Sequence, residues 1–244
     1  MFKILAVNSL ISAYVMSLLF LKGLRQGDTQ LVILGLIIAA FFYCVSQSAP
    51  CVKLAPYRPP SRLFSLPLIG SVLAQFALHM ACLLATIALC EPFIEEGEGG
   101  ALFALANASS VVNGTANGTA NGTAHAAAED EEVAFKATVF NTCVWLISAL
   151  MQVNTFAVNS RGYPFMQDFW RNKKLLYCTG AAYVLIVITT AEILPFVNEY
   201  IELVPLPSES FRLQLIGIFA VDVIGVFALE RVIETCGGRT RNNR

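Results

Sequence analysis

Charged residues are scarce in this sequence, and so are the motifs that carry most enzymatic chemistry. Asp, Glu, Lys and Arg make up 14% of the 244 residues, whereas a soluble domain has about 25%. The net charge is -1, which argues against nucleic acid as a partner because such binding needs a basic surface. The sequence contains no G-x-x-x-x-G-K-[ST], no G-x-S-x-G and no H-E-x-x-H, so it offers none of these nucleotide, hydrolase or zinc-protease motifs.

Hydrophobic residues are abundant instead, at 56% of the chain. They gather in six runs, each of roughly 18–23 residues, long enough to cross a hydrocarbon core of about 30 Å as a helix. Open sheet edges do not survive in lipid, so all six runs should be helical. The sequence therefore predicts an all-α membrane protein, a bundle of about six transmembrane helices at residues 4–21, 31–49, 68–90, 138–158, 175–196 and 213–233.

The chain divides into three parts by composition. Residues 1–90 hold the first three runs, and residues 138–244 hold the last three runs and a basic tail. Residues 91–137 between them form a low-complexity insert rich in Ala, Gly, Asn and Thr, with little to bury. We expect this insert to be a flexible tether.

The loops alternate in charge, and this sets the expected topology. Segments 51–62 and 161–174 and the C-terminal tail are rich in Lys and Arg, whereas segments 91–136 and 197–210 are acidic. The positive-inside rule places the basic loops and both termini in the cytosol. The insert then lies in the lumen, which agrees with its four N-x-[ST] glycosylation acceptors at Asn107, Asn113, Asn117 and Asn121.

Polar residues inside the runs are the candidate functional residues. Gln75 and His79 are four residues apart and share a helix face. Asp222 is the acidic residue well inside the sixth run, and it should face the bundle because a charge in lipid is costly. Asn8 and Ser12 give the first run a polar side. Each of these residues could line a polar cavity or serve only in hydrogen bonds between helices.

Two of the seven cysteines, Cys90 and Cys143, fall near the expected luminal side. A disulfide between them is one interpretation, since the lumen is oxidising. Burial as small apolar side chains is the default for a cysteine in a membrane helix.

Three separated segments carry a resemblance to a known family. They are "MFKILAVNSLISAYVMSLLFLKGLRQGDTQ", "KLAPYRPPSRLFSLPLIGSVLAQFALH" and "FAVNSRGYPFMQDFWRNKKLL". They resemble the C-terminal membrane portion of the type V-A P-type ATPases of the endoplasmic reticulum. That family carries a similar V-N-x-x-G-x-P-F-M stretch and a similar R-P-x-x-x-[IL]-F…Q-F-A-x-H pattern. The resemblance covers the chain apart from residues 95–132 of the insert.

The resemblance implies a fold, a location and an activity. The six runs would correspond to the fifth to tenth helices of a P-type ATPase in the endoplasmic reticulum membrane. The family hydrolyses ATP, with Mg²⁺ and a phospho-aspartate in a D-K-T-G motif, to extract misinserted transmembrane helices. Its partners would be the lipid bilayer, client helices and the N-terminal part of the ATPase. Asn8 and Ser12 match positions on the fifth helix, which borders the family's substrate cavity.

The catalytic parts of that family are absent from this sequence. It has no D-K-T-G motif and no nucleotide-binding or actuator domain. We therefore assign it no catalytic residue, no cofactor-binding residue and no metal ligand, and we expect upstream sequence to supply ATP and Mg²⁺ binding. Two alternatives stay open: the membrane half of a cation-transporting ATPase, as the family's older name implies, and a stand-alone six-helix structural module.

Overall fold

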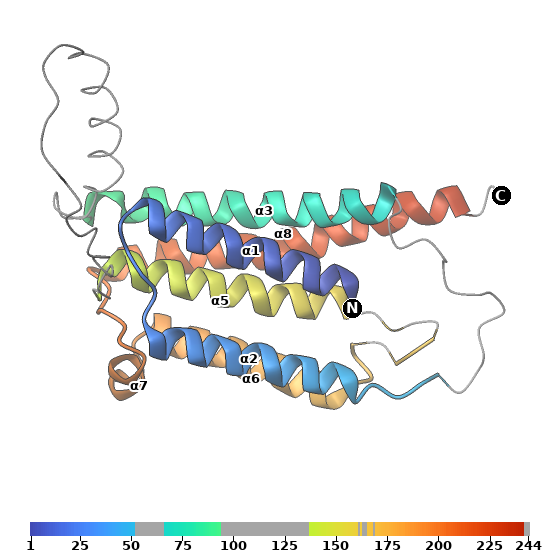
Figure 1. Ribbon diagram of the computed structural model, residues 1–244, viewed down its shortest axis with the longest axis horizontal. Coiled ribbons are helices and arrows are strands. Elements are labelled where there is room, and N and C mark those ends of the chain that lie inside the picture. The colour runs from blue at the N-terminus through green and yellow to red at the C-terminus, as the bar shows by residue number, and fades with distance from the viewer. Residues whose placement is uncertain (52–65, 94–136, 161, 163–164, 168, 242–244) are drawn as a thin grey trace, which may run out of the picture.

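Helices make up most of the part of the chain that the structure describes. The computed structural model describes residues 1–51, 66–93, 137–160, 162, 165–167 and 169–241, and within these ranges it contains no β-strand. The prediction of an all-α membrane protein is confirmed. The elements are α1 (Phe2–Leu21), α2 (Asp28–Ser46), α3 (Leu66–Cys90), the 3₁₀ turn η1 (Glu91–Phe93), α5 (Val139–Asn159), α6 (Lys173–Thr190), α7 (Pro195–Tyr200) and α8 (Glu209–Arg241) (Figure 1).

Two predicted regions lie outside the described residues. One is the segment 94–136 of the insert, with all four glycosylation acceptors, Asn107, Asn113, Asn117 and Asn121. The other is the basic segment 51–62, of which only Cys51 is described.

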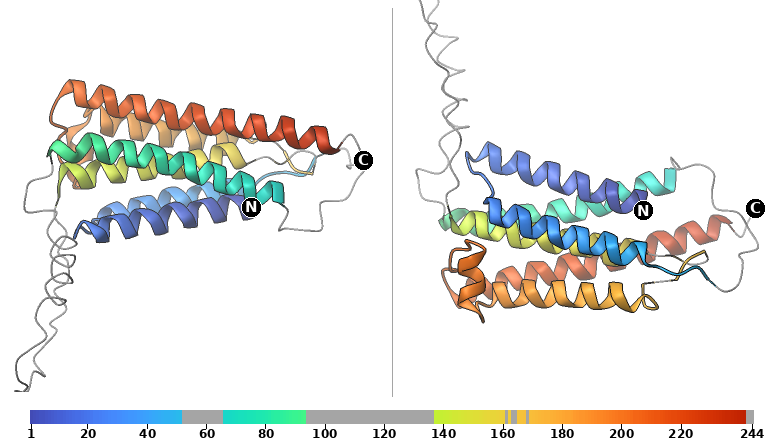
Figure 2. Two further views of the ribbon diagram at one scale, coloured as in Figure 1. Left: turned by 90° about the horizontal axis from the view of Figure 1, so that it is seen from above. Right: turned by 60° about the horizontal axis from the view of Figure 1, so that its bottom comes forward.

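Among the described residues, five helices are long and apolar enough to cross a membrane. They are Phe2–Leu21, Asp28–Ser46, Leu68–Phe93, Val139–Asn159 and Lys173–Thr190. The sixth predicted run, residues 213–233, lies inside α8, which runs beside α3 (Figures 1 and 2). Met1 and the end of α8 lie at the same end of the bundle, opposite α7 (Figure 1).

α5 is the central helix. It contacts all five other long helices, with α1, α3 and α8 on one side and α2 and α6 on the other (Figure 1). Its residues from Phe140 to Val158 are all buried. A helix in this position must hold its polar side chains against protein, where they find hydrogen-bond partners that lipid cannot supply.

Local signals fix the helix ends. After α1, Gly23 adopts φ 67° and the Leu24 amide donates to the Leu19 carbonyl at 2.9 Å. This is the Schellman geometry that favours glycine, and it turns the chain sharply into α2. Thr138 caps the start of α5 by accepting from the Asn141 amide at 3.1 Å.

The fifth predicted run differs from the helix that it contains. The run was expected to continue to residue 196, but α6 ends at Thr190 and a separate short helix, α7, begins at Pro195. Glu192 lies at φ 54°, which no helix tolerates, and Pro195 disfavours helical backbone at the residue before it. The Asn198 side chain then donates to the Thr189 carbonyl at 3.0 Å and folds α7 back over the end of α6.

Candidate functional site

A cavity of about 190 Å³ opens between α1, α2 and α5. Its walls are mostly apolar, with a few polar side chains placed among them. One helical turn separates two of these, Ser148 and Gln152, so α5 presents both on one face. The lining residues are Ser12, Val15, Met16, Gln26, Leu31, Leu34, Gly35, Ile38, Ser148 and Gln152.

Two glutamines in this cavity have unused hydrogen-bonding atoms. Gln26 is 3% exposed and its Nε2 has no partner among the described residues. Gln152 is 2% exposed and its Oε1 likewise has none. A buried polar atom without a partner costs about 1–3 kcal/mol. Both side chains line the cavity, so its wall holds one donor and one acceptor that lack partners among the described residues.

A second cavity continues the first toward the α1–α2 turn. It has a volume of about 570 Å³ and shares Met16, Gln26 and Leu31 with the first cavity. Its other lining residues are mainly apolar, and Arg25 lies at its edge. Together the two cavities form a groove between α1 and α2, which we call the α1–α2 groove.

The two residues of the first run that were singled out in the sequence lie on the same side of α1. Ser12 lines the smaller cavity and is exposed. Asn8, one turn earlier, is 8% exposed, and neither its Oδ1 nor its Nδ2 has a hydrogen-bond partner among the described residues. α1 thus carries one buried, unpaired amide, that of Asn8, one turn before the groove-lining Ser12.

A chain of buried hydrogen bonds crosses the middle of the bundle. Asp222 of α8 contacts His79 of α3 through Oδ1 and Nδ1 at 2.8 Å. Its other oxygen accepts from Asn154 of α5 at 2.7 Å, and the Tyr183 hydroxyl of α6 donates to Asn154 at 2.5 Å. His79, Asp222 and Asn154 are fully buried. This chain of side chains joins α3, α8, α5 and α6.

A second cluster lies nearer the end of the bundle that holds Met1. Glu230 of α8 accepts from Lys3 of α1 at 2.6 Å and from Ser71 and Gln75 of α3 at 3.0 and 2.9 Å. The side-chain amides of Gln75 and Asn159 of α5 pair reciprocally, at 3.2 and 2.9 Å. The first and last helices are therefore joined through one carboxylate.

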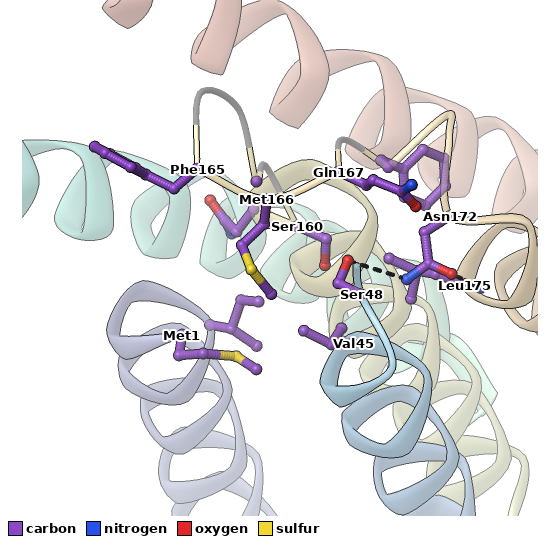
Figure 3. A pocket seen from close by; sticks show the side chains of 13 residues that line it. Met1, Val45, Ser48, Ser160, Phe165, Met166, Gln167, Asn172 and Leu175 are labelled. Carbon is purple, nitrogen blue, oxygen red and sulfur yellow. Dashed lines mark hydrogen bonds between the residues drawn. The ribbon is translucent and has the colours of Figure 1, made fainter. Parts of the chain in front are cut away.

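A third cavity, of about 240 Å³, shares Asn159 with this cluster (Figure 3). It is surrounded by the start of α1, the end of α2, the segment after α5 and the start of α6. Asn172 spans one side, donating to the Cys44 carbonyl at 3.0 Å and to the Ser48 hydroxyl at 3.3 Å. The lining residues include Met1, Ile4, Val45, Ser48, Asn159, Ser160, Gly162, Phe165, Met166, Gln167, Phe169, Asn172 and Leu175.

The V-N-x-x-G-x-P-F-M stretch builds a wall of this third cavity. Its Met166 pairs with Pro50 in an isolated antiparallel bridge, where the Cys51 amide donates to the Phe165 carbonyl at 3.1 Å. Gly162 is required by the turn, because a Cβ there would lie 2.3 Å from the Gln167 carbonyl oxygen. The stretch thus attaches the end of α2 to the start of α6.

Several residues of these sites were not recognised from the sequence. Gln26 sits in a short loop and gives no periodic signal. Asn154 and Tyr183 become partners only through the packing of α5 against α6. The spacing of Ser148 and Gln152, four residues apart, was the signal that could have indicated a polar face on α5.

Comparison with known proteins gives consistent relatives, although no family model matches the sequence. The chain is 33% identical over 238 residues to the endoplasmic reticulum transmembrane helix translocase of Schizosaccharomyces pombe, covering 96% of this chain and 17% of that protein. It is 30% identical over 230 residues to the protein of the same name in Saccharomyces cerevisiae, covering 94% and 16%.

A plant relative has a different name. The chain is 30% identical over 207 residues to "Probable manganese-transporting ATPase PDR2" of Arabidopsis thaliana, covering 85% of this chain and 15% of that protein. The chain thus spans about a sixth of the length of these relatives. Nearly all of the chain matches, and it matches a C-terminal part of them. The chain belongs to the type V P-type ATPases and corresponds to a C-terminal membrane region of them.

Proposed function

We propose that this chain is the membrane half of an ATP-driven translocase that extracts transmembrane helices from the endoplasmic reticulum membrane. The α1–α2 groove would receive part of the client helix. ATP and Mg²⁺ would act in upstream domains, and this chain would be non-catalytic by itself. Both termini would lie in the cytosol, and the bilayer and the upstream ATPase domains would be its partners.

The observation that supports this most is the pair of free polar atoms in the groove. A transmembrane helix that has been misinserted carries polar groups that lipid cannot satisfy. Gln26 Nε2 and Gln152 Oε1 could pair with such groups, while the apolar wall accepts the remaining side chains. The names of two relatives, both transmembrane helix translocases, favour the same substrate class.

Cation transport is the second candidate, since one relative is named for manganese. Manganese favours several oxygen ligands on one site. Here the two carboxylates inside the bundle are already engaged: Asp222 by His79 and Asn154, and Glu230 by Lys3, Ser71 and Gln75. A cation would have to displace these contacts, so the groove favours the helix substrate.

Site-specific photocrosslinking tests the substrate class. A photoreactive residue at Ser12 would sit in the groove, and one at Val184 on the exposed side of α6 is the matched control. In the protein with its upstream domains, we expect Ser12 to crosslink a misinserted client helix in a nucleotide-dependent manner and Val184 to crosslink lipid. Equal client crosslinking at both positions would refute the groove as the site.

An immunoblot tests the link to the ATPase domains. An antibody against the C-terminal tail should detect a band several times larger than 26.5 kDa in membranes. A band near 26.5 kDa would instead favour the stand-alone structural module. A downward shift after endoglycosidase treatment would support a luminal insert.

A further inference from the structure

Two thiols meet at the end of the bundle opposite Met1. Cys90 is the last residue of α3, and Cys143 lies near the start of α5. Both are free in the structure, and they are 1% and 0% exposed. The two thiols lie close enough to interact directly, on two helices that pack against each other although they are far apart in sequence.

The helices around the thiols hold this approach in place. α3 and α5 pack directly against each other, and η1, which follows Cys90 at once, contacts both of them. The Thr138 cap fixes where α5 begins. The two cysteines also bracket segment 94–136, whose acceptors place it in the lumen in the proposed topology.

We propose that Cys90 and Cys143 form a disulfide that joins α3 to α5 in the endoplasmic reticulum lumen. This rests on the luminal placement that is part of the proposed function. The lumen is oxidising, and its disulfides persist there. Such a bond would link the residues before segment 94–136 to those after it and close a covalent loop that contains this segment.

The oxidant would be a protein disulfide of the lumen. One cysteine thiolate attacks a sulfur of that disulfide and forms a mixed disulfide, and the second cysteine then displaces the oxidant as a dithiol. The two cysteines lose two electrons and two protons, and the oxidant gains them. Because both sulfurs are buried in the folded bundle, the exchange takes place during insertion, before α3 and α5 close together.

The chain contains a matched pair of thiols at the opposite end of the bundle. Cys44 near the end of α2 and Cys178 near the start of α6 also lie close enough to interact. Both are free and partly exposed. In the proposed topology they face the cytosol, where thiols stay reduced. Each pair thus brings together two thiols from different helices, and the two pairs differ in compartment.

The test is thiol counting after translation of the full chain into endoplasmic reticulum microsomes. The denatured, unreduced product is treated with a polyethylene glycol maleimide. Of the seven cysteines, we expect all but Cys90 and Cys143 to react, and all seven to react after reduction. The double variant Cys90→Ser/Cys143→Ser should show the same number of reactive thiols with and without reduction.

The variant Cys44→Ser/Cys178→Ser is the control, and it should keep two thiols that react only after reduction. Loss of the protected pair in this variant, or its survival when Cys90 and Cys143 are replaced, would assign the bond elsewhere and overturn the proposal. Endoglycosidase treatment of the same sample separates two failures. Glycosylated chains with seven reactive thiols would overturn the disulfide alone. Unglycosylated chains with seven reactive thiols would overturn the luminal placement as well.

Discussion

Two helices of similar length, α5 and α2, have opposite surroundings. In the most apolar stretch of α5, 94% of the residues are buried, whereas in α2 the figure is 17%. α5 nevertheless carries more polar side chains, among them Gln152, Asn154 and Asn159. In a soluble protein the more apolar helix would be the buried one. In this bundle lipid accepts the apolar surface, so the helix that must reach protein partners is the more polar one.

The comparison also separates two kinds of contact. α5 is held by packed rings and by hydrogen bonds: Phe156 stacks on Phe41 with ring centroids 4.8 Å apart, and Trp145 Nε1 donates to the Gln30 carbonyl at 3.1 Å. α2 exposes Val32 and Leu36, which are 61% and 64% exposed. Truncating a side chain of α5 should therefore lower the free energy of unfolding more than truncating an exposed side chain of α2.

The largest expected effect is that of Trp145→Ala in α5. Trp145 is 1% exposed, so the change leaves a cavity and breaks its hydrogen bond to α2. We expect it to lower the free energy of unfolding by about 3–5 kcal/mol. Leu36→Ala in α2 should change it by less than about 0.5 kcal/mol. Unfolding in mixed detergent micelles measures both changes. Equal losses of unfolding free energy would show that side chains of α2 and α5 contribute alike to stability.

The next largest effect should come from Asp222→Ala. This change leaves His79 and Asn154 buried without their carboxylate partner. We expect the free energy of unfolding to fall by about 3 kcal/mol in the same assay. Asp222→Asn keeps the shape of the side chain and one acceptor oxygen, so its free energy of unfolding should fall clearly less. A full loss with Asn would mean that the negative charge, and not the hydrogen bonds, holds α3, α5 and α8 together.

A smaller effect is expected for Gly162→Ala, which tests how α2 is attached. The new Cβ would meet the Gln167 and Met166 backbone, so the bridge to Pro50 must shift, at a cost of about 1–3 kcal/mol. Gly35→Ala in α2 has nothing within 4 Å of its Cβ. It should be neutral or stabilise the helix by up to about 1 kcal/mol. Thermal unfolding of detergent-solubilised chains would rank the two variants.

The smallest effect on stability should be that of Gln152→Leu. It removes a buried acceptor that has no partner among the described residues, so the free energy of unfolding should stay the same or rise by up to about 1 kcal/mol. In the protein with its upstream domains, client crosslinking at Ser12 should nevertheless fall. A variant that is destabilised, with crosslinking intact, would show that Gln152 serves the fold.

The sequence predicted the fold class well because lipid imposes strict rules on it. The chain has apolar runs of membrane-spanning length, and in lipid every backbone N–H and C=O group must be hydrogen-bonded within the protein. Few folds satisfy both conditions. It also indicated that Asp222 and His79 would face protein. It could not give the partners Asn154 and Tyr183, nor the position of Gln26, because these depend on how helices distant in sequence rotate against one another. The end of α6 was misplaced because the apolar run continues through Ile193 and Leu194, beyond the bend at Glu192.

The contact between Lys3 and Glu230 ties the first helix of the bundle to the last. It joins the first turn of α1 to α8. Glu230 also accepts from Gln75 of α3, which pairs with Asn159 of α5. These bonds join four helices, α1, α3, α5 and α8, at the end of the bundle that holds Met1. α2 is held by other contacts: the Trp145 bond to its Gln30 carbonyl, its packing against α5 and α6, and the bridge at Pro50. The two sides of the α1–α2 groove therefore depend on different sets of contacts.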